Sequence, residues 1–112
     1  MKSNELRIGN YYDENGKIHK ADINDLVNLV RFEQTEYKSD MKPIKLTETW
    51  LEMFGFRKQN TEWFIDGMTI FEWKNNFYYH AMDPKLTVEL LYVHQLQNLY
   101  FALTGEELKY QH

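Results

Sequence analysis

Apolar residues recur every three or four positions near the C-terminal end of the chain. This stripe consists of Val93, Leu96, Leu99, Tyr100 and Leu103. Thr104 and Gly105 follow it, and a glycine directly after such a stripe is a common helix end. The spacing predicts a C-terminal helix that packs on the rest of the fold through these side chains.

Aromatic-rich runs alternate with short polar turn sequences through the middle of the chain. The turn sequences are Gln59-Asn60, Asp66-Gly67, Lys74-Asn75-Asn76 and Asp83-Pro84. Such residues favour tight turns between strands. The pattern predicts four or five antiparallel strands, at about residues 56–58, 62–65, 68–73, 77–82 and 86–91.

The first third of the chain predicts a hairpin and a short helix. Residues 7–12 and 17–23 alternate as strands do, and residues 13–16 between them end in a glycine suited to a hairpin turn. Residues 24–33 fit a helix capped by Asn24 about as well as a strand, and we favour the helix. The polar stretch 34–42 has no apolar period and predicts an exposed loop.

A second helix is predicted just before the aromatic-rich runs. Thr47 supplies a hydroxyl acceptor ahead of Glu48, and Gly55 follows Phe54 directly. An N-cap hydroxyl, an acidic first turn and a terminal glycine together indicate two helical turns. Trp50, Leu51 and Phe54 form the apolar stripe of this helix.

Strands grouped together, with helices beside them, predict an α+β fold. We expect an antiparallel β-meander with an N-terminal hairpin, a short central helix and a C-terminal helix packed on the sheet. Size scaling and the lack of a linker-like stretch predict a single domain over residues 1–112. The sequence has no apolar run near 18 residues and no signal-peptide pattern, so we expect a protein of the cytoplasm.

Composition narrows the possible chemistry. The chain has no Cys, which excludes disulfides, thiolate zinc sites and a cysteine nucleophile. None of the four His lies three or four residues from another, the five Gly are too widely spaced for a phosphate loop, and neither Ser has a nucleophile context. Paired carboxylates such as Glu106-Glu107 fit solvated surface better than acid–base catalysis. We therefore expect no enzymatic activity, no cofactor and no metal.

Aromatic residues are the one group in excess of what folding requires. Seven of them crowd into residues 63–79. Because side chains alternate across a strand, they cannot all enter one core face, and exposed Trp and Tyr are common interface anchors. The alternative is that both faces of the sheet are packed. The candidate interface residues are Trp63, Trp73, Tyr78, Tyr79, Arg57 and Lys58.

Three blocks of sequence carry a resemblance to a known group of proteins. They are residues 6–11 (LRIGNY), residues 43–51 with 54–56, and residues 93–108 (VHQLQNLYFALTGEEL). Together they resemble a family of small uncharacterised proteins from phages and prophages of Bacteroidetes bacteria, whereas residues 22–41 depart from its pattern. The resemblance implies a mobile-element origin. Some proteins of this kind resemble anti-CRISPR inhibitors, which bind RNA-guided nucleases of the host.

We therefore expect a non-enzymatic phage or prophage protein that inhibits a host defence effector, most readily an RNA-guided CRISPR nuclease with its guide RNA. The formal net charge of −4 would aid encounter with a basic nucleic-acid channel. The first alternative is a nucleic-acid-binding accessory protein that uses Arg57, Lys58, Trp63 and Trp73. The second alternative is a small hydrolase that uses a carboxylate or His80.

Overall fold

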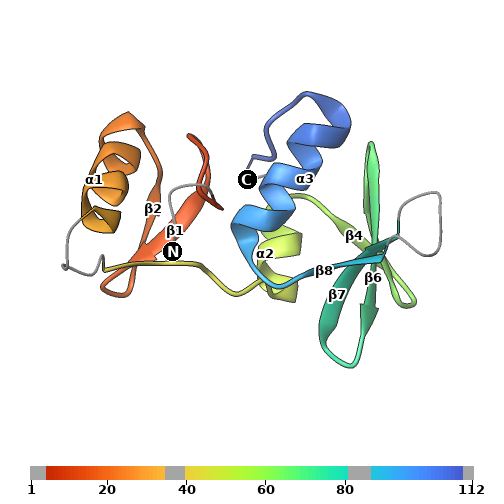
Figure 1. Cartoon of the computed structure of the whole chain (residues 1–112). Helices are drawn as coiled ribbons and strands as arrows, with labels where there is room; N and C mark the ends of the chain where they lie inside the picture. The colour runs from red at the N-terminus through yellow and green to blue at the C-terminus, as the bar shows by residue number, and fades with distance from the viewer. Residues whose placement is uncertain (1–4, 35–39, 81–86, 110–112) are drawn as a thin grey trace.

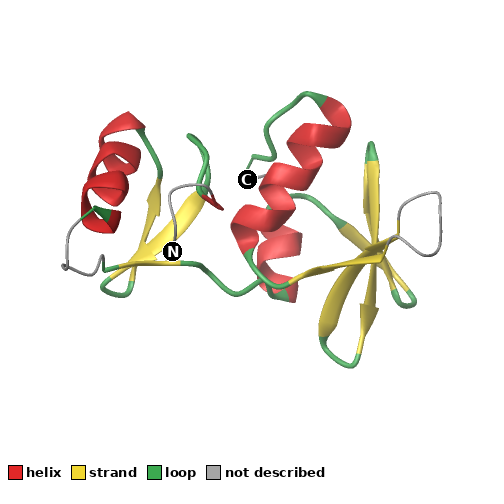
Figure 2. Cartoon of the chain, in the orientation of Figure 1, coloured by secondary structure: helices red, strands yellow, loops and turns green. Residues whose placement is uncertain are grey.

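A computed structural model describes residues 5–34, 40–80 and 87–109 and arranges them in four layers (Figures 1 and 2). Helix α1 (Ile23–Glu33) covers one face of a three-stranded sheet, and helices α2 (Glu48–Met53) and α3 (Val93–Thr104) lie between that sheet and a five-stranded one. The smaller sheet has the order β2-β1-β3, from β1 (Tyr11–Glu14), β2 (Lys17–Lys20) and β3 (Met41–Lys42). The fold is α+β, as predicted.

The predicted N-terminal hairpin is present, but its strands have other bounds. Asp13 and Glu14, which were predicted in the turn, pair with β2 as part of β1, and residues 7–10, predicted as strand, precede it. Asn15 and Gly16 join β1 to β2 with φ of 53° and 82°, as a two-residue hairpin turn requires. The predicted helix follows, but Asn24 is not its cap. The Asp22 side chain accepts the backbone N–H of Asp25, and Asp25 accepts that of Asp22, so this capping box starts the helix earlier than expected.

The prediction of a loop over residues 34–42 is wrong at its C-terminal end. Met41 and Lys42 form β3, which pairs antiparallel with Asp13 and Glu14 of β1. Met41 is buried in a small apolar cluster made with Leu6, Tyr12, Ala21 and Leu29. A single apolar residue produces no periodicity, so sequence pattern alone does not detect a strand made by pairing across more than 20 residues of chain. Residues 35–39 lie outside the described chain.

The larger sheet is the predicted antiparallel meander. Its order is β4-β5-β6-β7-β8, formed by Arg57–Gln59, Glu62–Ile65, Met68–Trp73, Asn76–His80 and Thr87–Leu90. The predicted bounds hold to within about one residue in the described chain, while residues 81–86 lie outside it. Helix α2 is capped as predicted, since Thr47 Oγ1 accepts the backbone N–H of Trp50. Trp50, Leu51 and Phe54 are all buried in the larger core.

Helix α3 ends at Gly105 as predicted, with φ of 74°. Val93, Leu96 and Tyr100 are buried against the sheet and Leu99 is partly buried. Leu103, however, is 43% exposed, which corrects the predicted stripe. The buried sector of α3 is centred on Val93, Gln97 and Tyr100, because this helix packs on both of its sides. None of the described helices is long and apolar enough to cross a membrane.

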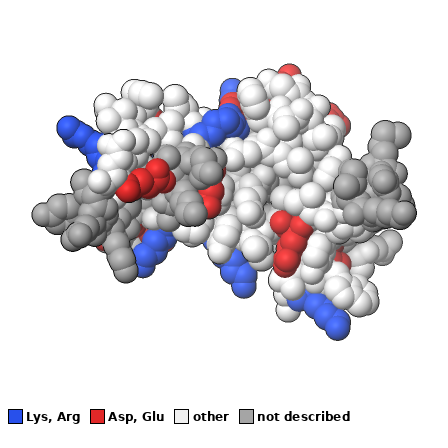
Figure 3. Space-filling view, viewed as in Figure 1, with Lys and Arg blue, Asp and Glu red and all other residues white. Residues whose placement is uncertain are grey.

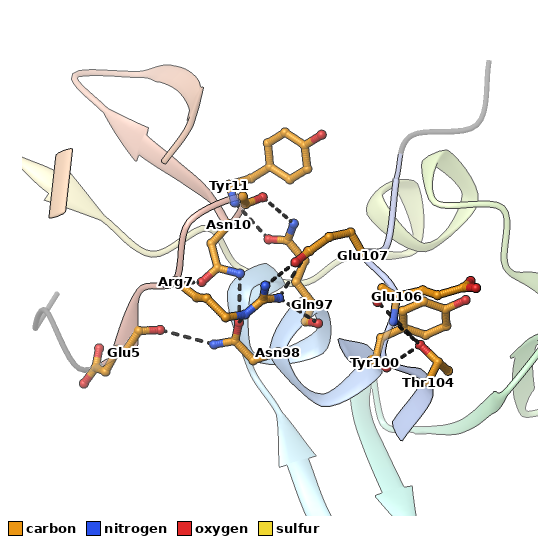
Figure 4. A network of polar contacts seen from close by, with 11 residues as sticks. Glu5, Arg7, Asn10, Tyr11, Gln97, Asn98, Tyr100, Thr104, Glu106 and Glu107 are labelled. Atoms are coloured by element: carbon orange, nitrogen blue, oxygen red, sulfur yellow. Dashed lines mark hydrogen bonds and ion pairs between the residues drawn. The ribbon is translucent and has the colours of Figure 1, made fainter. Parts of the chain in front are cut away.

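Gln97 joins α3 to the smaller sheet (Figure 4). Its side chain is fully buried, its Oε1 accepts the backbone N–H of Tyr11 at 2.8 Å, and its Nε2 donates to the carbonyl of Gly9 at 3.1 Å. One side-chain amide thus pairs with two backbone groups, the N–H of Tyr11 at the start of β1 and the carbonyl of Gly9 just before the strand. The Tyr11 ring completes this contact, 5.7 Å from the Trp50 ring of α2 and 6.1 Å from that of Phe54.

Asn98 and Arg7 extend this polar seam. Asn98 Oδ1 accepts from Arg7 Nε at 3.1 Å and from Asn10 Nδ2 at 2.9 Å. The Arg7 guanidinium pairs with both carboxylate oxygens of Glu107 and stacks 4.3 Å from the centre of the Phe101 ring. The two sheets are therefore linked by directional polar contacts, in addition to the packing of Tyr11.

The buried position of Leu96 predicts a large stability loss on truncation. Leu96→Ala should lower the free energy of unfolding by about 2 to 5 kcal/mol, because it removes a fully buried side chain and leaves a cavity. Leu103→Ala, on the same helix, should change it by less than about 0.5 kcal/mol. Urea denaturation monitored by circular dichroism measures both values, and equal losses in the two variants would contradict this packing.

Candidate interaction surface

The five-stranded sheet has one face covered by α2 and α3 and one face that no described helix covers (Figure 1). Met68 and Ile70 of β6 are buried towards the helices, while Thr69 between them is exposed. Because successive side chains alternate, Phe71 and Trp73 lie on the side of Thr69. The uncovered side of this sheet is therefore partly aromatic.

Strand register brings four aromatic residues together on this side. Phe71 is paired with Tyr78 of β7, and Phe64 of β5 with Thr69. Trp73 is 64% exposed and Phe64 is 36% exposed, while Phe71 and Tyr78 are half-buried. We call these four residues, Phe64, Phe71, Trp73 and Tyr78, the open aromatic face.

Contacts between neighbouring strands hold part of the open aromatic face in place. The ring of His80 packs edge-on against Phe71 at 4.6 Å, and His80 Nδ1 lies 2.7 Å from the Thr87 hydroxyl of β8. Lys74 Nζ lies 5.8 Å from the centre of the Trp73 ring. The His80 ring thus holds Phe71 in place, whereas Trp73 is exposed to solvent next to the β6–β7 turn.

A hollow lies at the β4 corner of the open aromatic face. It has a volume of about 300 Å³ and is lined by Gly55, Arg57, Phe64, Ile65 and Asp66. Arg57 is paired with Phe64 across strands, so both side chains project to the open side. The hollow offers one cation, one anion and one aromatic ring to a projecting side chain.

Charges of both signs flank the open aromatic face. Glu62 is paired with Phe71, and Glu89 with Tyr78, so an exposed carboxylate lies on each side of the aromatic residues. On the side of the molecule in Figure 3, acidic and basic side chains are likewise interspersed. The described residues of neither surface form the dense basic patch that is typical of a nucleic-acid interface.

The structure divides the six predicted interface residues between the two faces of the sheet. Arg57, Trp73 and Tyr78 lie on the open side, as the register shows. Trp63, Tyr79 and Lys58 lie on the helix side. Trp63 is only 2% exposed and belongs to the core, and Tyr79 packs partly against that core. These positions do not bring the six residues onto one surface.

Lys58 is engaged within the protein. Its Nζ lies 3.3 Å from Glu48 of α2 and 3.6 Å from Glu72 of β6, and the hydrogen bond to Glu48 raises the pKa of Lys58. Trp63 Nε1 donates to Glu72 at 3.0 Å. Burial alone would raise the pKa of Glu72, but these hydrogen bonds hold it below its usual value. Lys58 and Trp63 therefore form an internal network.

Phe64 and Phe71 were not among the predicted interface residues, although a signal for them exists in the sequence. Thr69 between Met68 and Ile70 indicates which positions of this strand face the core. Continuing the alternation places residue 71 on the solvent side with residue 73. Strand register, which fixes the place of Phe64 beside them, depends on the turn geometry rather than on composition.

Among the histidines, His94 has an unusual environment. It is buried at the start of α3, stacks on Tyr92 at 5.8 Å, and its Nδ1 has no hydrogen-bond partner in the described chain. Burial lowers the pKa of His94 and outweighs the nearby Glu5 carboxylate. Among the described residues, no three His, Asp or Glu side chains are placed to share a metal ion.

The lowered pKa of His94 predicts a loss of stability in mild acid. The unfolded chain takes up this proton near pH 6.5, whereas the folded protein resists it, so protonation favours unfolding as the pH falls below that value. The free energy of unfolding should fall more between pH 7 and pH 5 in the wild type than in His94→Gln. Chemical denaturation at both pH values measures this difference, and parallel pH profiles would show that His94 titrates normally.

No family model, no curated protein and no solved structure matches the chain.

Proposed function

We propose that this chain is a non-enzymatic binding protein that inhibits a host defence effector by covering part of its surface. The observation that carries the proposal is the open aromatic face, where Trp73 is 64% exposed on a rigid antiparallel sheet. Exposed Trp and Tyr on a rigid element lose little conformational entropy when they bind. They are also the residues that most often dominate protein–protein binding energy.

The surroundings of the open aromatic face indicate what kind of surface it fits. Glu62 and Glu89 flank the aromatic residues, and the whole chain has a formal net charge of −4. The complementary surface has an apolar centre, with basic residues at the positions opposite Glu62 and Glu89. The channel of a nuclease that holds guide and target is basic because it binds phosphates. The rim of this channel therefore supplies basic residues of the kind that would face Glu62 and Glu89.

The sequence resemblance supports the choice of effector. The block at residues 93–108 resembles proteins from phages and prophages of Bacteroidetes, some of which resemble inhibitors of RNA-guided nucleases. We therefore propose an RNA-guided CRISPR nuclease, loaded with its guide RNA in the host cytoplasm, as the partner. Inhibition would result from occupying the surface that handles guide or target.

A nucleic-acid-binding accessory function is the second candidate, because aromatic rings on a sheet with a nearby arginine can stack single-stranded bases. Of the four residues first assigned to that role, only Arg57 and Trp73 lie on the open side, while Lys58 and Trp63 are engaged in the internal network. The flanking carboxylates also repel phosphates. The geometry therefore favours a protein partner.

Replacing the exposed tryptophan tests the proposal. Trp73→Ala should weaken binding to the effector by about 2 kcal/mol or more, because it removes the most exposed aromatic anchor. The free energy of unfolding should change by less than about 1 kcal/mol, since Trp73 contributes little to the core. The effector is first captured from host lysate with the wild-type protein, identified by mass spectrometry, and then titrated against each variant.

Val27→Ala is the matched control, because Val27 is an exposed apolar residue on α1 at the other end of the molecule. It should leave effector binding unchanged. Equal binding by the wild type and by Trp73→Ala would contradict the proposal. Tight binding of single-stranded RNA alone, with a steep loss as salt rises, would instead support the second candidate.

A further inference from the structure

Strand β2 forms one edge of the three-stranded sheet, at the end of the molecule away from the open aromatic face (Figure 1). All four of its residues, Lys17, Ile18, His19 and Lys20, are exposed. Ile18 is 54% exposed, which places an apolar side chain on an uncovered strand edge. Such an edge is a template for pairing with another extended chain.

The hairpin turn determines which backbone groups of β2 face outward. With Asn15 and Gly16 as the two turn residues, Glu14 and Lys17 exchange hydrogen bonds, and so do Tyr12 and His19. Ile18 and Lys20 occupy the alternate positions. Their N–H and C=O groups therefore point away from β1, towards solvent.

The hydrogen bonds of β1 support this register. The backbone N–H of Tyr11, which is paired with Lys20, points away from β2 and donates to Gln97 Oε1. Asp13, which is paired with Ile18, pairs on its other side with Lys42 of β3. The outward N–H of Tyr11 and the outward side of Asp13 are thus occupied within the protein. The equivalent groups of β2 have no hydrogen-bond partner in the described chain.

Charge selects what can pair with this edge. The strand carries two lysines and a histidine but no acid, on a chain with a formal net charge of −4. Neither Lys17 nor Lys20 forms an ion pair in the described chain. Lysines on an edge repel a second copy of the same strand, and they attract a strand that carries carboxylates.

From these observations we propose that β2 is a docking edge for an extended acidic segment of a partner protein, which adds antiparallel to β2 as a fourth strand. Ile18 and Lys20 lie on one side of the sheet, and Lys17 and His19 on the other. The segment therefore has four consecutive residues of the types acidic, any, apolar and acidic. In the antiparallel pairing, the first acidic residue contacts Lys20, the apolar residue contacts Ile18 and the second acidic residue contacts Lys17. This site is separate from the open aromatic face and does not depend on it.

A labelled peptide tests the docking edge directly. The probe is a capped fluorescent peptide with the central sequence Glu-Thr-Val-Glu, and the control peptide carries Lys in place of both Glu. Fluorescence anisotropy should show saturable binding of the acidic peptide to the full chain and at least roughly tenfold weaker binding of the control. No binding of the acidic peptide, or equal binding of both peptides, would overturn the proposal.

Three variants test the two parts of the recognition, the backbone pairing and the charge. Ile18→Pro removes one outward N–H without breaking a bond to β1, so it should abolish peptide binding, whereas Ile18→Thr keeps the N–H and should retain most of it. Lys17→Glu combined with Lys20→Glu should reverse the preference between the two peptides. This double variant alters only exposed side chains, so it tests the proposal even if Ile18→Pro fails to fold.

The Trp73→Ala variant separates this site from the proposed function. It should bind the acidic peptide as the wild type does, because Trp73 belongs to the other sheet. Unchanged peptide binding by the Lys17→Glu and Lys20→Glu double variant would show that the peptide binds elsewhere, and would overturn the proposal.

Discussion

The buried amide of Gln97 is the interaction on which the arrangement of the whole molecule depends. It lies in the middle of α3, in the same buried sector as Val93, Leu96 and Tyr100, and makes one hydrogen bond to Tyr11 and one to Gly9. Leaving such a buried group unpaired costs about 1–3 kcal/mol. Both bonds form only when the start of β1 lies in one position against α3. Gln97 therefore fixes where the smaller sheet lies relative to the larger one.

This arrangement determines which surfaces remain open. Helices α2 and α3 are covered on two sides, by Tyr11 and the polar seam on one and by the five-stranded sheet on the other. The two surfaces that we propose for partners therefore lie at the outer ends of the molecule. The open aromatic face and the β2 edge differ in chemistry, since the first presents rings between carboxylates and the second presents backbone groups between lysines.

Features set by neighbouring residues could be predicted from the sequence. The cap at Thr47, the turn glycine at Gly16 and the helix end at Gly105 each depend on one residue type at one position, and all three are present. The division of aromatics between the sheet faces depends on register, and register places the candidate interface residue Trp63 on the face that packs against the helices. The burial of Gln97 could not be predicted, because the apolar pattern of a helix does not indicate which polar residues lie in its buried sector.

Amide hydrogen exchange followed by NMR, in the wild type and in Gln97→Met, tests the role of this side chain most directly. Methionine keeps the approximate volume but removes both hydrogen-bonding groups. Amide exchange in Gln97→Met should be faster at Tyr11 and throughout β1 and β2, with protection in β6 and β7 little changed. Unchanged protection at Tyr11, or an equal loss of protection in both sheets, would contradict this role of Gln97.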